Sequence, residues 1–176
     1  MRYIGIDTGT QCGYAVVDAH GVRLDSGIWH FGLKPDERDG QRLARFIHAS
    51  RALIASQQEH DRCCVGYEKA YPITPVTAAL AGAFEGCLQV VCEQLRVPIR
   101  PIAPMSIKKH ALSGRATKAQ MVEAANRRWN REIRIDYREG QFDKLMQPKP
   151  PTFPGGGDNE ADALWTADAL RAGIGA

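Results

Sequence analysis

The stretch Tyr3-Ile4-Gly5-Ile6-Asp7-Thr8-Gly9-Thr10 determines how this chain begins to fold. Its apolar residues predict a buried strand at 2–7, and the acid and Gly-containing turn that follow indicate where the strand ends. Two further segments, at about 12–18 and 22–31, have the length and composition of strands joined by tight turns. The chain therefore starts with a β-meander, and Asp7 stands at the end of its first strand.

The later strands and helices alternate along the chain. Strands are expected at 62–67 and 97–102, and helices at about 36–59, 74–96, 105–112, 117–130 and from Asp158 onward. This order is that of a ribonuclease-H-like α/β domain, a five-stranded mixed sheet flanked by helices. The prolines of 97–102 place that strand at an edge of the sheet.

Length and composition favour one cytoplasmic domain. We expect a single domain over 1–176, with the Pro/Gly-rich segment 136–157 as a flexible loop. Hydrophobic residues make up 44% of the chain, yet no run of 18 apolar residues occurs, so no membrane span is expected. Met1 leads straight into a strand, which argues against a signal peptide. The five cysteines form no C-x-x-C motif and are expected to be reduced.

Positive charge is concentrated in one part of the chain. Between Arg96 and Arg138 there are 11 Lys/Arg against 3 Asp/Glu, a local charge of +8, whereas the whole chain carries only +3. Such a stretch can simply be a solvated face. Beside an acidic metal site it is better explained as a surface that binds the phosphates of a nucleic acid.

Four acidic residues occupy positions that this fold brings to one end of the sheet. Asp7 and Glu68 each end a strand, and Asp158 and Asp162 lie one turn apart on the last helix. Carboxylates gathered in this way repel one another and are costly to desolvate. A divalent cation such as Mg²⁺ removes that cost and prefers oxygen ligands. The four acids therefore predict a metal-dependent phosphoryl-transfer site.

Simpler explanations exist for three of these acids. Asp158 could simply be the cap of its helix and bind no metal, since Asp is a favoured capping residue. Asp7 could only form the turn before Thr8-Gly9, and Glu68 could be a solvated residue at the end of a strand. These alternatives remain open at the level of sequence.

Four segments, taken in order, resemble the motifs of one enzyme family. They are Ile4-Gly5-Ile6-Asp7-Thr8-Gly9-Thr10 with Gly13-Tyr14-Ala15; Glu68 after its strand; Ser106-Ile107-Lys108-Lys109 followed by Gly114-Arg115-Ala116-Thr117-Lys118-Ala119-Gln120-Met121; and Asp158-Asn159-Glu160-Ala161-Asp162-Ala163-Leu164. Together they resemble RuvC-type Holliday junction resolvases, and the closing motif resembles phage-type members in particular. The resemblance covers about 1–135 and 158–172, and 136–157 has no recognised counterpart.

The resemblance implies a crossover junction endodeoxyribonuclease that resolves four-way DNA junctions by paired symmetric nicks. Two Mg²⁺ ions, for which Mn²⁺ can substitute, would be held by Asp7, Glu68, Asp158 and Asp162, with Asp7 and Asp162 as the bridging candidates. Lys118 is implied as the catalytic lysine at the scissile phosphate, although it could instead be a plain surface lysine at the start of a helix. Two symmetric nicks imply a homodimer, and the small-residue helix 74–96 is the candidate interface, although its Gly82 and Gly86 could instead serve close packing against the chain's own sheet.

The resemblance also implies a set of DNA-binding residues. They are Tyr71, Lys108, Lys109, Arg115 and Lys118. Tyr71 would stack on bases opened at the junction centre, although it could instead only pack on Pro72. By its spacing to Gly114, Lys109 matches the family's phosphate clamp better than Lys108 does. Four arginines are expected either to contact phosphates generally or to be solvated: Arg115, Arg127, Arg128 and Arg131.

The chain departs from the family pattern at the fourth acid. Bacterial RuvC spaces its final acids three apart, which would put Asn159 in the ligand position. Here the acid is Asp158, four residues before Asp162 and still on the same helical face, with Glu160 as the alternative. The run from Gly114 to Lys118 is also shorter than in bacterial RuvC.

Other functions compete with junction resolution. Gly5-Ile6-Asp7-Thr8-Gly9-Thr10 also resembles the phosphate loop of actin-like sugar kinases and chaperone ATPases, whose nucleotide lies between two such domains. A catalytically dead nucleic-acid-binding module is a third class, but it would be expected to lose its acids. A nuclease of this kind could also act on other branched DNA, flaps or RNA–DNA hybrids.

Overall fold

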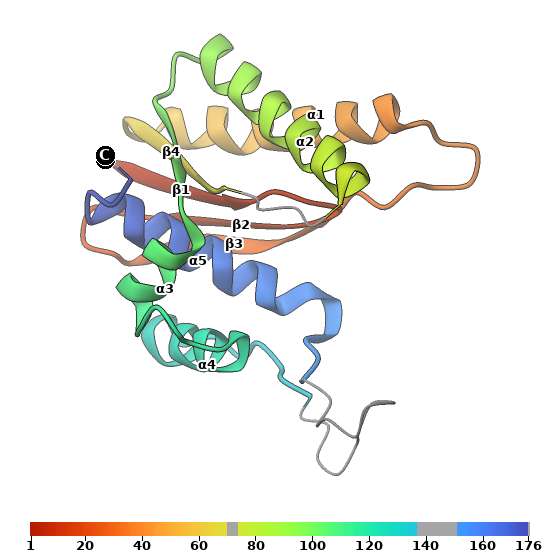
Figure 1. Cartoon of the computed structure of the whole chain (residues 1–176). Coiled ribbons are helices and arrows are strands. Elements are labelled where there is room, and N and C mark those ends of the chain that lie inside the picture. Colours follow the sequence, from red (N-terminus) through yellow and green to blue (C-terminus); the bar gives the residue numbers. More distant parts are fainter. Residues whose placement is uncertain (70–73, 137–150, 176) are drawn as a thin grey trace, which may run out of the picture.

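A five-stranded mixed sheet lies at the centre of the protein (Figure 1). The computed structural model describes residues 1–69, 74–136 and 151–175. Strands follow the order β3-β2-β1-β4-β5, and they comprise β1 (Arg2–Asp7), β2 (Gln11–Val17), β3 (Arg23–His30), β4 (Cys63–Glu68) and β5 (Ile99–Ile102). β1 lies at the centre, antiparallel to β2 and parallel to β4, and β2 is antiparallel to β3, so the predicted meander is confirmed. The proline-containing β5 lies at an edge, as predicted.

Helices cover both faces of the sheet (Figure 1). One face is covered by α1 (Asp39–Gln58) and α2 (Pro75–Gln94), and the other by α5 (Gly157–Arg171). The short α3 (Pro104–Ala111) and α4 (Lys118–Trp129) pack against α5. Each face has its own hydrophobic core, with Ile4 and Ile6 of β1 on the α1/α2 side. This architecture confirms the predicted ribonuclease-H-like fold class.

Two glycines let α5 lie directly on the sheet. A Cβ atom at Gly5 would stand 2.1 Å from the backbone oxygen of Ala163, and one at Gly13 would stand 1.9 Å from that of Asn159. Any side chain at either position would push the helix away, because backbone atoms cannot rotate aside. Gly13 is the register partner of Asp7, so α5 approaches the sheet closely beside the strand-ending acid.

The helix α2 has one packed face and one open face. Phe84, Leu88 and Val91 are buried in the core, whereas Val76 and Val90 are 79% and 52% exposed. By length and composition α2 could cross a membrane, although the sequence predicted no such helix. A helix with one face in a protein core passes the same test, so this composition is weak evidence of a span.

Candidate active site

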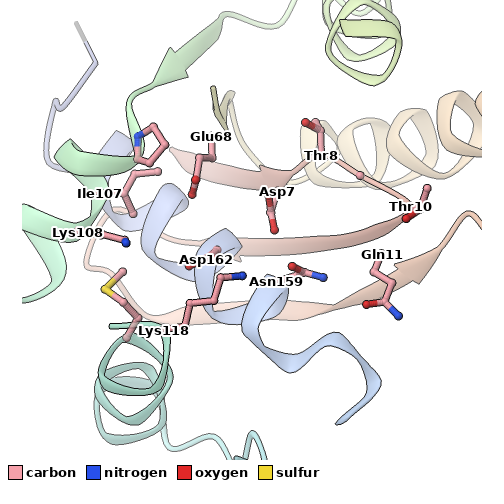
Figure 2. A pocket seen from close by; sticks show the side chains of 13 residues that line it. Asp7, Thr8, Thr10, Gln11, Glu68, Ile107, Lys108, Lys118, Asn159 and Asp162 are labelled. Atoms are coloured by element: carbon pink, nitrogen blue, oxygen red, sulfur yellow. The ribbon is translucent and has the colours of Figure 1, made fainter. Parts of the chain in front are cut away.

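The carboxyl ends of β1 and β4 border a cavity of about 460 Å³ (Figure 2). Three of the four predicted acids line it: Asp7 from β1, Glu68 from β4 and Asp162 from α5. Lys108 of α3 and Lys118 of α4 also line it. The topology thus brings together residues that are up to 155 positions apart in the sequence, as predicted from the order of the elements.

The three acids destabilise one another's charged forms. Burial raises the pKa of Asp7 well above its usual value, and the charges of Asp162 and Glu68 raise it further. Burial and the charge of Asp162 raise the pKa of Glu68 to about 7. The pKa of Asp162 is raised to about 6, mainly by burial, although Lys118 opposes the shift. Both Asp7 and Glu68 line the shared cavity and are only partly exposed, so Glu68 is not a fully solvated residue at the end of a strand.

The chemistry of the cavity suits a hard cation. Besides its carboxylates, the cavity contains the amide of Asn159 and the hydroxyl of Thr8, whose buried oxygen has no hydrogen-bond partner among the described residues. Oxygen donors of this kind are the ligands that Mg²⁺ prefers, and a cation would relieve the repulsion between the acids. Within the described residues, however, no group of three or more His, Cys, Asp or Glu is arranged to hold a metal ion. The acids therefore share a cavity without forming a closed coordination shell.

Asp158 and Asn159 occupy different places. Asp158 is not among the residues that line the cavity, whereas Asn159 is, close to Asp162 and Asp7 in Figure 2. The Lys118 ammonium donates a hydrogen bond to Asp158 Oδ2 over 2.6 Å. Asp158 does not cap its helix either: the N-cap residue of α5 is Gly156, with no side-chain capping bond.

Glu160, the alternative fourth acid, is held by other partners. Its Oε1 accepts hydrogen bonds from the Ser26 hydroxyl (2.7 Å) and from Arg131 Nε (3.0 Å). The Glu160 side chain is buried by these contacts and does not line the cavity. Arg131, whose side chain is partly exposed, therefore neutralises a buried acid, a role that the sequence did not predict.

The predicted basic residues divide into two groups. Lys108 and Lys118 line the cavity. Lys109 is exposed and lays its stem against the Gly114 turn, where a Cβ atom on the glycine would stand 3.3 Å from Lys109 Cγ. Arg115 is exposed on the turn before α4. The lysine nearest the acids on α3 is thus Lys108, whereas the spacing favoured Lys109.

Opposing effects act on the ammonium of Lys118. Burial lowers its pKa, but the hydrogen bond to Asp158 and the charges of Asp162 and Asp7 outweigh burial and raise the pKa overall. Lys118 therefore stays charged beside the acids.

Two predictions concern residues beyond this cavity. Tyr71, the predicted base-stacking residue, lies outside the described residues, as does most of the loop expected at 136–157.

Thr8 and Gln11 line the cavity, although no role was predicted for them. The signal for Thr8 was available, since it directly follows the strand-ending acid, whereas nothing in the sequence singles out Gln11.

Comparison with known proteins supports the fold. No family model matches this sequence, and no curated protein matches it. Among solved structures, Thermus thermophilus RuvC superposes with a TM-score of 0.71 at 21% identity, over 99% of this chain and 98% of that one. This chain has the ribonuclease-H-like fold of RuvC. The T. thermophilus RuvC in complex with a Holliday junction substrate gives the same TM-score at 20% identity, over 99% of this chain and 93% of that one.

Proposed function

We propose that this chain is a Mg²⁺-dependent, structure-selective endonuclease that resolves four-way DNA junctions by paired symmetric nicks. The observation that carries the proposal is the cavity shared by Asp7, Glu68 and Asp162, whose mutual repulsion calls for a cation. The junction as substrate is supported by the fold, which is shared with a RuvC solved on a Holliday junction. At 20% identity that likeness establishes the fold alone, so the residues of the cavity must carry the chemistry.

Asp7, Glu68 and Asp162 would hold the metal, with Asp7 and Asp162 as the bridging pair and Mn²⁺ as a substitute for Mg²⁺. Two such ions, when bound, activate a water and stabilise the leaving 3′-oxygen of a phosphodiester. The Thr8 hydroxyl and the Asn159 amide line the same cavity as these acids. Each would form hydrogen bonds with metal-bound waters, either as donor or as acceptor. Asp158 was the fourth ligand expected from the sequence, and its role is taken up below.

The basic residues around the cavity would bind the DNA backbone. Lys108 and Lys118 line the cavity and would meet the scissile phosphate, whereas Lys109 and Arg115 are exposed and would contact neighbouring phosphates. Tyr71 is proposed to stack on a base opened at the junction centre. Such an enzyme would act in the cytoplasm as a single domain over 1–176.

We also propose that two copies associate through the open face of α2. Among the described residues, nothing lies within 4 Å of a Cβ atom built on Gly82 or Gly86. These glycines therefore do not serve close packing against the chain's own sheet, the other reason considered for them. Exposed Val76 and Val90 lie on the same helix. A two-fold dimer would match the two-fold symmetry of the junction.

A second class of function, an actin-like phosphotransferase, is less well supported. In such proteins the nucleotide lies between two domains of this type, whereas the acids here line a cavity within one domain. Nucleases that act on other branched DNA or on RNA–DNA hybrids would use the same carboxylate chemistry.

The decisive experiment compares cleavage of a mobile four-way junction with cleavage of linear duplex, flap and RNA–DNA hybrid substrates, with and without Mg²⁺. We expect paired nicks in the junction that require the metal, and little cleavage of linear duplex. Preferred cleavage of flaps or hybrids would replace the junction as the substrate, and cleavage without any metal would reject the mechanism. Nucleotide hydrolysis in the absence of DNA would favour the phosphotransferase.

A further inference from the structure

The contact between Lys118 and Asp158 assigns a different role to the acid that the sequence placed fourth in the metal site. We propose that Asp158 is a positioning residue, whose carboxylate holds the Lys118 ammonium at the lip of the cavity instead of ligating the metal. This inference rests on the proposed nuclease function and deepens it.

The surroundings of Asp158 support this role. Its carboxylate oxygen lies 2.6 Å from Lys118 Nζ, and its side chain lines a separate hollow together with Thr117, Ala119 and Phe153. Lys118 lines both that hollow and the carboxylate cavity. The lysine therefore stands at the boundary between the two spaces, of which one is lined by Asp158 and the other by Asp7, Glu68 and Asp162.

The position of Lys118 in its helix explains why it needs a counter-ion. Lys118 is the first residue of α4, where the helix dipole disfavours a positive charge. Thr117 already caps this helix, so the lysine is not required for helix initiation. Asp158 lies in the first turn of α5, where the dipole favours a carboxylate. One carboxylate thus offsets the unfavourable placement of Lys118 and is itself well placed.

Fixing this lysine matters because its side chain is otherwise free to move. The Lys118 side chain is 56% exposed, whereas that of Asp158 is 17% exposed and belongs to the helix that also carries Asp162. An exposed lysine has many rotamers, and a charge-assisted hydrogen bond to a partly buried partner restricts them. An ammonium group has three donors, so one bond to Asp158 leaves two for phosphate oxygens. Asp158 would therefore orient Lys118 without competing with the substrate.

The experiment separates positioning from metal ligation by a double-mutant cycle. Asp158→Asn should reduce single-turnover cleavage of the junction about 10-fold, and Lys118→Met about 100-fold. The double variant should be no slower than Lys118→Met alone, because Asp158 acts through the lysine. Asp158→Glu, which keeps the carboxylate, should recover most of the rate. Asp61→Asn is the matched control: this exposed acid pairs with the chain's N-terminus and lies outside the site.

Two further readouts do not depend on cleavage. Mn²⁺ binding, measured by calorimetry on the DNA-free protein, should change less than 3-fold in Asp158→Asn and should be lost in Asp162→Asn. The ¹⁵N signal of the Lys118 ammonium should move toward that of a free lysine in Asp158→Asn but not in Asp158→Glu. Circular dichroism of each variant checks that it is folded.

Either of two results would overturn the inference. One is loss of Mn²⁺ binding in Asp158→Asn, which would make Asp158 a ligand; the other is a full 10-fold loss of cleavage rate on the Lys118→Met background. If the wild-type protein cleaves no DNA at all, the proposed function fails instead. The Mn²⁺ and ¹⁵N measurements then still decide whether Asp158 binds metal or holds Lys118.

Discussion

Two acids on the same helix, Asp162 and Asp168 of α5, are treated in opposite ways by their surroundings. Asp168 is 1% exposed and accepts hydrogen bonds from His110 (2.9 Å), Arg128 (3.1 Å) and Arg171 (2.7 Å). Burial raises its pKa, but the hydrogen bonds from Arg171 and His110 and the charge of Arg128 outweigh burial, so the pKa is lowered overall. Asp162 instead faces Asp7 and Glu68, and its pKa is raised.

The difference separates an acid that stabilises the fold from an acid that we propose to serve function. Around Asp168 the protein supplies its own cations, which tie α3 and α4 to α5. Around Asp162 it supplies more carboxylates, and the charges of Lys118 and Lys108 offset them only in part. Such an incompletely neutralised cluster lowers stability, and that cost is expected where a charged ligand is to be bound.

The largest expected effect follows from Asp7→Asn. Cleavage of the junction should fall at least about 10³-fold, because a bridging ligand is lost, while binding to the junction should change little. The metal-free protein should become more stable, since one of three repelling carboxylates is removed. Cleavage rates and thermal melts of the same samples measure both effects. Cleavage at the normal rate would show that Asp7 is not part of the active site.

Asp168, the acid that is paired with cations, should behave in the opposite way. Asp168→Asn leaves two arginines without their buried partner and should cost about 2–4 kcal/mol of unfolding free energy. Cleavage by the folded protein should stay within about 3-fold of the wild-type rate, because Asp168 does not line the cavity. Urea unfolding measures the first quantity. Loss of cleavage at full stability would show that Asp168 has a catalytic role.

The pH dependence of stability should also separate the two acids. In the folded protein, Glu68 and Asp162 hold protons up to pKa values of about 7 and about 6, which is above those of the unfolded chain. The stability of the metal-free protein should therefore fall as pH rises from about 4 to 7 through this cluster. Asp168, with its lowered pKa, adds stability above its unfolded pKa and loses it as pH falls.

Magnesium should stabilise the protein only through the cluster of Asp7, Glu68 and Asp162. Addition of Mg²⁺ should raise the melting temperature by a few degrees at pH 7.5 and much less at pH 5, where the acids are protonated. Asp162→Asn should remove this effect, and Asp168→Asn should keep it. A magnesium shift that survives Asp162→Asn would place the metal elsewhere.

The smallest effect is expected at Glu160, a third acid of α5 whose partners are Arg131 and Ser26. Glu160→Gln keeps a hydrogen-bond acceptor but loses the ion pair with a partly exposed arginine, and should cost about 1–2 kcal/mol. Cleavage should be unaffected, since Glu160 does not line the cavity. A large loss of metal binding in this variant would restore Glu160 as a ligand.

Much of this arrangement was predictable from sequence. The period of the apolar residues gave the order of the elements, and that order brings Asp7, Glu68 and Asp162 to one end of the sheet. The sequence could not show which residue of the last helix joins these three acids in the cavity, because Asp158 and Asn159 are neighbours at the start of that helix. Their placement depends on how α4 packs beside α5, which brings Lys118 to Asp158. The roles of Arg128 and Arg131 depend likewise on ion pairs with acids of α5, which are far away in the sequence.

The most direct test of a metal site at Asp7, Glu68 and Asp162 is a crystal of the protein soaked in Mn²⁺ and examined by anomalous scattering. We expect a manganese peak coordinated by carboxylate oxygens of these three residues, with Asp158 still hydrogen-bonded to Lys118. Three side chains pointing apart with no peak between them, at an Mn²⁺ concentration that supports junction cleavage, would contradict the account.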